Sequence, residues 1–289
     1  MLVDEQGNTL SETPSIPPLT DRQKQEAEHR TSVSALVVHE AIRKDGDEEL
    51  RRPVSALAWS GLAAGLSMGF SFVAEALIRT YVPAAPWRPL ITNFGYPLGF
   101  LIVIVGRQQL FTENTLTAII PLLARRNITT FSQVMRLWGV VLVANIIGAH
   151  IFAWVIGNTP VLHPRFQLAL GQLATEAADV SFGAAILRGI FAGWLIAMVV
   201  WMLAATDSNR IPIIIILTYI VGLAGLTHVV AGSVEVLFLV MTGAKSWFAF
   251  LGGYMIPTLI GNVLGGVAMV SALNHAQVIA GTPPGSKRT

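Results

Sequence analysis

The chain has 289 residues, of which 53% are hydrophobic and 12% are charged, and its mean hydropathy is +0.61. Soluble domains carry about 25% charged residues, so this balance excludes an ordinary water-soluble domain and predicts a protein that crosses the lipid bilayer several times. Cysteine is absent, which excludes disulfides and thiolate metal sites, and the net charge of +2 gives no reason to expect a nucleic-acid partner.

The first 52 residues are rich in charge and precede the first long apolar run, which begins near Val54. Residues 1–31 are polar and contain several prolines, so a disordered N-terminal extension is expected there. Residues 32–52 predict an amphipathic helix on the cytoplasmic side, which either lies against the mouth of a pathway or is a solvated stalk that packs on the spans. No cleavable signal peptide is expected.

Six apolar runs within residues 53–275 are long enough to cross about 30 Å of hydrocarbon, and they predict a six-span transport domain. The runs cover residues 54–79, 92–122, 133–157, 182–205, 211–242 and 248–273. The second and fifth runs are too long for one span and carry polar residues near their middle, at 107–114 and 225–228. These two spans are therefore predicted to be helices that break inside the membrane.

The positive charges of the loops predict the orientation of the chain. Lysine and arginine are concentrated in residues 1–52, in the turns at 123–132 and 206–210, and in the tail at 276–289. All of these segments fall on one side of a six-span protein. By the positive-inside rule this side is cytoplasmic, so both termini and the 276–289 tail are expected there.

An internal repeat divides the domain into two halves of three spans. An Asn-x-x-Gly motif begins at Asn145 in the third run and at Asn262 in the sixth. Asn145 follows Thr112 by 33 residues and Asn262 follows His228 by 34, so Thr112 and His228 are expected at matched positions. Because each half has an odd number of spans, the second copy enters the membrane from the opposite side. We therefore predict an all-α inverted 3+3 repeat whose breaks meet at mid-membrane.

The two breaks are the candidate site. A helix broken in lipid leaves backbone groups that must line a watery path or be buried in protein. Thr112 and Asn114 could offer a hydroxyl and an amide to that path, or could only cap the helix ends. His228 titrates near neutral pH as a free side chain and is a candidate proton carrier, or else a packing residue. His150 lies on an unbroken span and is expected to be structural.

Charged residues near the spans are further candidates, because a charge in the membrane normally faces the protein interior or a partner. They are Arg107, Glu113, Arg188, Glu75 and Glu235. For Arg107, with Glu113 across the break, and for Arg188, ion pairing is expected in preference to contact with substrate. Glu75 is expected at the outer edge of the first span. Small residues at Gly61, Gly65, Gly69, Gly189 and Gly193 allow close approach of helices. We find no nucleotide, hydrolase or zinc motif, so no enzyme, cofactor or metal site is expected.

The motifs together resemble the formate/nitrite transporter family over about residues 33–275. The resemblance rests on Leu110-Phe111-Thr112 in the second span, Gly225-Leu226-Thr227-His228 in the fifth, and the paired Asn-x-x-Gly motifs. The stretch Arg-Gln-Gln-Leu-Phe-Thr-Glu-Asn-Thr and the long polar N-terminus are most similar to its YfdC-like branch. The resemblance implies a homopentamer in the bacterial inner membrane, with an aquaporin-like fold and one pore in each protomer.

The resemblance also implies the residues of the pore. His228 would be its central histidine, with Thr112 beside it. Hydrophobic constrictions would be formed by Tyr96, Phe100, Leu110, Phe111 and Val221. Gly193 and Gly232 stand where formate channels carry asparagine, and Thr227 stands in place of a glutamate, which leaves the choice of anion open.

We therefore predict a channel or transporter for a small monovalent anion or its conjugate acid, such as formate, nitrite or hydrosulfide, with protons as a further partner. Two alternatives remain at this point. One is a channel for a neutral solute, although the Asn-Pro-Ala motifs of water channels are missing. The other is a non-transporting membrane scaffold or assembly protein, which the replaced asparagines and the charged N-terminus would suit.

Overall fold

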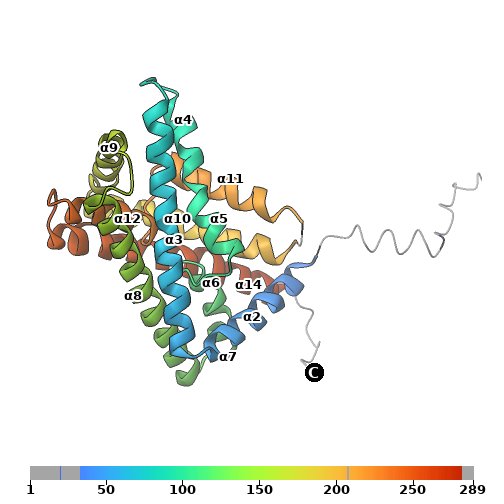
Figure 1. The fold of residues 1–289 in the computed structure, drawn as a ribbon. Helices are drawn as coiled ribbons and strands as arrows, with labels where there is room; N and C mark the ends of the chain where they lie inside the picture. The colour runs from blue at the N-terminus through green and yellow to red at the C-terminus, as the bar shows by residue number, and fades with distance from the viewer. Residues whose placement is uncertain (1–19, 21–32, 207, 282–289) are drawn as a thin grey trace, which may run out of the picture. The chain divides into compact units, whose positions relative to one another are not determined.

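The computed structural model describes residues 20, 33–206 and 208–281, and every regular element in these residues is helical (Figure 1). The α-helices are α2 (Ala35–Arg51), α3 (Val54–Tyr81), α4 (Arg88–Thr92), α5 (Pro97–Val105), α6 (Asn114–Thr117), α7 (Ile119–Arg125), α8 (Ile128–Asn158), α9 (Gln167–Ala178), α10 (Phe182–Ala204), α11 (Arg210–Leu223), α12 (Ala231–Met241), α13 (Ile256–Leu264) and α14 (Leu273–Ala280). Short 3₁₀ segments are η1 (Asn93–Gly95) and η2 (Pro164–Phe166), and π-helical segments are η3 (Ala249–Met255) and η4 (Gly265–Ala272). The all-α class is confirmed, whereas the expected disorder of residues 1–31 falls almost entirely outside the described residues.

Five helices in the described residues are long and apolar enough to cross a membrane, judged by length and composition. They cover Val54–Tyr81, Arg88–Val105, Ile128–Asn158, Phe182–Ala204 and Ala249–Ala280. The remaining run is divided into the shorter apolar helices α11 and α12. Both predicted breaks are present, since residues 106–113 follow α5 and residues 224–230 separate α11 from α12. The inverted orientation of the two halves stays a prediction from the odd number of spans in each.

Glycines bring the helices of each half into close contact. In the first half, a Cβ built on Gly65 of α3 would lie 2.9 Å from the Cα of Asn145 on α8. In the second, a Cβ on Gly193 of α10 would lie 2.7 Å from the Cα of Asn262 on α13. The small residues of spans one and four therefore pack inside one protomer, as their use in close helix approach predicts. They are accordingly not free to form a contact between subunits.

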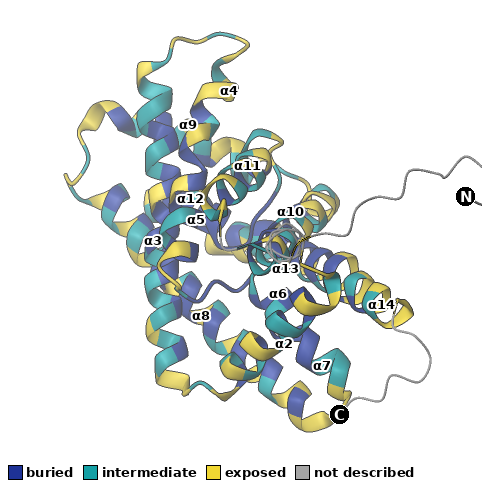
Figure 2. Ribbon diagram, turned by 90° about the vertical axis from the view of Figure 1, so that its right-hand side faces the viewer, coloured by how far each residue is buried: buried dark blue, intermediate teal, exposed yellow. Residues whose placement is uncertain are grey.

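The burial pattern follows from this packing. Figure 2 shows buried residues gathered toward the middle of the helical bundle, and exposed residues on its outer faces and at helix ends. Large apolar side chains remain exposed on the outside, among them Trp59 at 73% and Phe248 at 85%. Such exposure would be costly in water but is expected where a helix faces lipid or another subunit.

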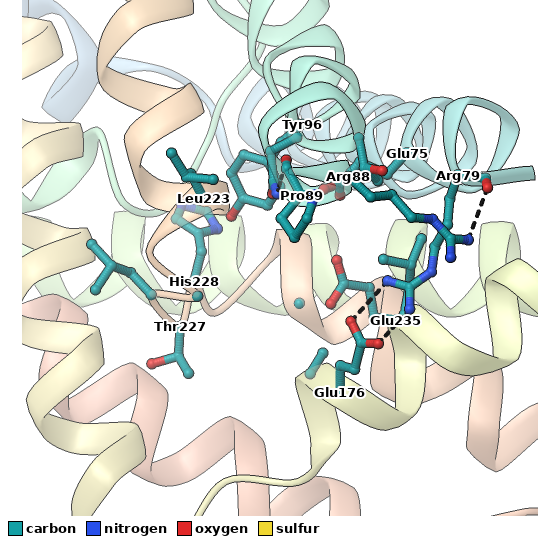
Figure 3. Close-up of a pocket in the computed structure, with 18 of the residues that line it drawn as sticks. Glu75, Arg79, Arg88, Pro89, Tyr96, Glu176, Leu223, Thr227, His228 and Glu235 are labelled. Atoms are coloured by element: carbon teal, nitrogen blue, oxygen red, sulfur yellow. Dashed lines mark hydrogen bonds and ion pairs between the residues drawn. The ribbon is translucent and has the colours of Figure 1, made fainter. Parts of the chain in front are cut away.

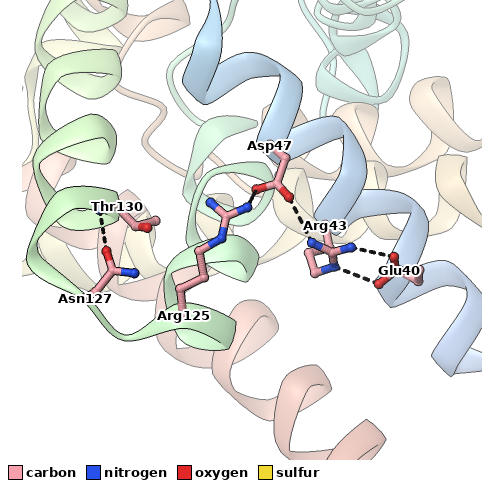
Figure 4. A network of polar contacts seen from close by, with 6 residues as sticks. All are labelled: Glu40, Arg43, Asp47, Arg125, Asn127 and Thr130. Carbon is pink, nitrogen blue, oxygen red and sulfur yellow. Dashed lines mark hydrogen bonds and ion pairs between the residues drawn. The ribbon is translucent and has the colours of Figure 1, made fainter. Parts of the chain in front are cut away.

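Helix α2 is docked on the bundle by its apolar face and by polar contacts. Val38, Ile42 and Leu50 are buried, and Gly46 allows α2 to cross α6 and α7 at close range. Figure 4 shows Asp47 of α2 joined to Arg125 at the end of α7, with an oxygen to nitrogen distance of 2.6 Å. Helix α2 is therefore part of the packed structure of the described residues.

Three features of the chain were not expected from the sequence. Helix α9 lies between the third and fourth spans, in a segment that we expected to be a loop. The half-helix expected after Thr112 is interrupted at Ala118, which leaves α6 only four residues long. The sixth span contains two π-helical segments and continues through α14 to Ala280, beyond the expected end of the transport domain.

Candidate functional site

The two breaks meet through one hydrogen bond between side chains. Thr112 Oγ1 lies 2.8 Å from His228 Nε2, and the two residues are 0% and 1% exposed. Thr112 lies in the second span, just before α6, and His228 lies in the fifth, just before α12. The structure therefore brings together the two residues that sequence reasoning placed at the centre of the site.

Asn145 holds the first break in place. Its Nδ2 donates to the backbone carbonyls of Gly61 on α3, at 2.7 Å, and of Gln109 in the break, at 2.9 Å. Its Oδ1 accepts from the backbone N–H of Phe111 at 2.9 Å. Two backbone groups that the interrupted helix would leave without partners are therefore satisfied by one buried amide, which also ties the break to α3.

Asn262 holds the second break in the same way. Its Nδ2 donates to the carbonyls of Gly189 on α10 and Thr227 in the break, both at 2.9 Å. Its Oδ1 accepts from the backbone N–H of Val229 at 2.8 Å. We call Asn145 and Asn262 the clamp asparagines. Their equivalent contacts are the strongest structural sign of the internal repeat.

The clamp contacts set a register that differs from the one expected. The Oδ1 of the clamp asparagine accepts from the backbone N–H of Phe111 in the first half and of Val229 in the second, so these two residues are equivalent. The residue before each is then also equivalent, and Leu110 matches His228. Thr112 lies two positions further along. Thr112 and His228 are therefore not equivalent residues of the repeat, although their side chains meet.

The ring of His228 is fixed by backbone donors. Its Nδ1 accepts from the N–H groups of Val230 at 3.3 Å and Ala231 at 3.1 Å, at the start of α12. A nitrogen that accepts these bonds carries no proton, so we assign the neutral ring with its hydrogen on Nε2. Nε2 then donates to Thr112, whose own hydroxyl hydrogen can point toward a ligand.

Apolar residues enclose this polar centre. The predicted constriction residues Tyr96, Phe100, Leu110, Phe111 and Val221 all belong to one buried cluster and are at most 6% exposed. The ring of Phe100 stands edge-on to the imidazole of His228, with 5.1 Å between centroids, and Tyr96 lies 5.4 Å from Phe100. These rings surround the Thr112–His228 contact with low-polarity surface.

A cavity of about 490 Å³ leads from the α4 and α9 end of the bundle to His228 (Figure 3). We call this cavity the vestibule. It is lined by residues of α3, α4, α9, α10, α11 and α12 and of η3, together with the second break. Its charged lining residues are Glu75, Arg79, Arg88, Glu176, Arg188 and Glu235. The vestibule reaches Tyr96 and Thr227 at its inner end.

Some charged groups of the vestibule have hydrogen-bond or ion-pair partners, and others have none among the described residues. Arg79 forms an ion pair with Glu176, with 2.9 Å between Nη1 and Oε2, and Arg88 donates from Nη2 to the carbonyl of Arg79 at 2.9 Å (Figure 3). Neither Glu75 nor Glu235 has a hydrogen bond or ion pair among the described residues. Glu75 was expected at the outer edge of the first span, but it is only 5% exposed and faces this cavity.

Several vestibule residues were not among the predicted site residues. Arg79 lies near the end of α3, Arg88 lies at the start of α4, Glu176 lies on the unexpected α9, and Tyr254 lies on η3. Arg79 could have been found, because it lies four residues after Glu75 and therefore on the same face of a helix.

Two of the predicted pore residues are committed to structural bonds. Asn114 donates from Nδ2 to Gln109 Oε1 at 3.0 Å and to the carbonyl of Leu110 at 3.2 Å, so its amide hydrogens stabilise the break. Thr227 lines the vestibule but donates its hydroxyl to the carbonyl of Ala185 at 2.8 Å. Neither side chain is arranged primarily as a donor to a ligand.

The expected ion pair between Arg107 and Glu113 is wrong. The two side chains form no salt bridge, and Glu113 Oε1 is buried without a hydrogen-bond partner among the described residues. Arg107 adopts a left-handed backbone conformation with φ of 51°, and its charge acts on Asp45 of α2. There, burial raises the pKa of Asp45 and Glu48 adds to this effect, whereas the charge of Arg107 lowers it.

The long apolar helices and the two broken spans define a multi-spanning membrane protein. A family model described as formate/nitrite transporter matches residues 36–276, and the chain belongs to this family.

Individual relatives agree with the family assignment. Inner membrane protein YfdC of Escherichia coli (strain K12) is 40% identical over 251 residues, covering 87% of this chain and 81% of the relative, which confirms the expected branch. Formate channel FocA of Haemophilus influenzae is 26% identical over 244 residues, covering 75% of this chain and 84% of the relative. A solved pentameric formate channel with formate bound has the same fold, with a TM-score of 0.64 at 20% identity over 82% of this chain and 99% of that one.

Proposed function

We propose that this protein passes a small monovalent anion, or its conjugate acid, across the bacterial inner membrane. The observation that carries the proposal is the buried contact between Thr112 and His228, which joins the two broken spans at the inner end of the vestibule. Family membership supports transport as the general activity. Relatives named as formate channels support a small anion as the substrate class.

The polar centre is suited to an anion or acid that has lost its water. Moving a bare anion through an apolar layer costs many kcal/mol unless donors replace its hydration shell. His228 holds the oxygen of Thr112 by its Nε2 hydrogen, so the hydroxyl hydrogen of Thr112 is left to donate. The rings of Tyr96 and Phe100 then select small solutes by size.

The remaining features of the proposal concern orientation. We place both termini and α2 in the cytoplasm by the positive-inside rule, which puts the vestibule on the periplasmic side. A scaffold with the same fold would bind partners but pass no solute, so a flux measurement separates these functions.

Removing the hydroxyl of Thr112 is expected to slow transport about tenfold, because loss of one buried donor costs about 1.4 kcal/mol in the pore. Initial formate and nitrite flux is measured in vesicles of phosphatidylethanolamine and phosphatidylglycerol with equal protein content. Thr112→Val is compared with Thr218→Val, whose buried hydroxyl bonds only to Ile214 of its own helix. Equal flux for the two variants would remove the role of Thr112, and absence of flux in the wild type would favour the scaffold.

Assembly gives a second test. We propose a homopentamer with one pore in each protomer, which the pentameric formate channel of similar fold supports. Native mass spectrometry in mild detergent is expected to show five copies of the 31.0 kDa chain. A dominant monomer or dimer that still transports formate would show that the pore does not depend on the pentamer.

A further inference from the structure

Two carboxyl groups face the vestibule from opposite elements. Glu75 lies on α3 and Glu235 on α12, and both line the cavity that leads to His228 (Figure 3). Glu75 is only 5% exposed, and both carboxyl groups open into the same cavity. Repulsion between two carboxylates held away from bulk water is relieved when they share a proton.

The vestibule offers these groups no partner of their own. Arg79 is already paired with Glu176, and no described residue donates a hydrogen bond to Glu75 or Glu235. Two further polar atoms at the same cavity, Thr92 Oγ1 and Arg88 Nε, are buried without a partner. Thr92 is only 3% exposed. Polar groups left unsatisfied around a cavity indicate a site that is completed by a ligand.

His228 is poorly arranged to supply the proton that a weak acid needs. Protonating its Nδ1 would break the bonds from Val230 and Ala231 that hold the start of α12. The carboxyl groups of Glu75 and Glu235 have no such bonds to lose. They also lie further out along the vestibule, before the apolar rings.

We propose that Glu75 and Glu235 form a proton-exchange pair that converts an entering weak-acid anion into its neutral acid. The inference rests on the proposed transport function. The O–H bond of the protonated carboxyl breaks and an O–H bond forms on the anion, which leaves as the neutral acid toward His228. The carboxylate regains its proton from water at the open end of the vestibule. Outward movement of the acid runs the same steps in reverse.

The other charged and titratable groups around the pair have separate roles. Arg88 on α4 and Arg188 on α10 attract the anion, and Arg188 has no ion pair among the described residues. Arg79 and Glu176 neutralise each other. Tyr96 and Tyr254 also line the cavity, and Tyr254 donates its hydroxyl to the carbonyl of His228 at 3.3 Å.

Substitution of either glutamate is expected to lower formate flux at least tenfold at pH 7 and to flatten its dependence on pH between 5 and 8. Glu75→Gln and Glu235→Gln keep the shape of the side chain but cannot exchange a proton. Glu49→Gln is the matched control, because it removes a carboxylate that is paired with Arg52 on α2 and does not line the vestibule. Its flux and pH profile are expected to equal those of the wild type.

A second readout separates this inference from the proposed function. Infrared difference spectra of the detergent-solubilised wild type are expected to show a protonated carboxyl signal that changes when formate is added. Both glutamine variants are expected to lack it. Wild-type flux with unchanged pH profiles in both variants would overturn the proton-exchange pair and leave the transport function standing. No wild-type flux and no carboxyl signal would overturn both.

Discussion

Gly193→Ala is expected to prevent the accumulation of folded protein. A methyl group at this position would lie 2.7 Å from Cα and 2.8 Å from the carbonyl carbon of Asn262, and both atoms belong to the backbone of α13. Overpacking usually costs about 1–3 kcal/mol, and here it costs more than about 3, because a helix backbone moves less easily than a side chain. The displaced residue is also a clamp asparagine, so the second break loses its support. Yield and thermal unfolding by tryptophan fluorescence measure the effect.

Gly183→Ala is the control for this substitution. Gly183 lies on the same helix, α10, and a methyl group there meets no atom within 4 Å. It is expected to leave the unfolding temperature unchanged or to raise it, since alanine favours a helix over glycine by up to about 1 kcal/mol. Equal behaviour of the two variants would show that α10 and α13 are not in close contact. The asparagine that formate channels carry at position 193 would be excluded by the same packing.

Asn262→Ala is expected to destabilise the protein by about 2 kcal/mol or more, because each buried group that loses its partner costs about 1–3 kcal/mol. The groups in question are the carbonyl of Thr227 and the N–H of Val229, and the tie to Gly189 on α10 is lost as well. His228 lies between Thr227 and Val229 in the chain, so its position relative to Thr112 is lost as well. Unfolding in mixed micelles measures the stability, and formate flux in the surviving fraction measures the pore.

Two further variants test the interpretation of the clamps. Asn145→Ala is expected to lose a similar amount of stability, since Asn145 makes three equivalent bonds in the first half. Asn158→Ala is expected to change stability by less than about 0.5 kcal/mol, because Asn158 is exposed at the end of α8. A loss of stability in only one of the variants Asn145→Ala and Asn262→Ala would contradict the equivalence of the two halves.

The positions of the breaks could be predicted from the sequence for a simple physical reason. An apolar run longer than one span that carries polar residues in its middle has few ways to cross a membrane. The clamp asparagines were also predictable, because the same motif follows both breaks at nearly the same distance. The spacings from Thr112 to Asn145 and from His228 to Asn262, which are 33 and 34 residues, did not set the register of the repeat. That register depends on which backbone groups the two asparagine amides bind.

The charged residues were harder to predict, because sequence proximity does not show where a side chain points. Arg107 and Glu113 are close along the chain, but they form no ion pair in the folded protein, where Glu113 Oε1 is buried without a partner among the described residues. Glu75 and Glu235 are 160 positions apart and line the same vestibule only after folding. Helix α9 escaped notice because it is too short and too polar to be read as a span.

The clamps have a consequence for the order in which the chain enters the membrane. Within the part of the chain that the structure describes, Asn145 bonds only to residues of the first three spans and Asn262 only to residues of the last three. A ribosome at the translocon can therefore release the first half, and its broken helix closes as soon as α8 arrives. The backbone groups bound by Asn145 thus have their partner before the second half is synthesised, whereas the carbonyl of Thr115 gains its bond from Ser271 only with the sixth span. The bond between Thr112 and His228 then forms late, when the second closed half docks against the first.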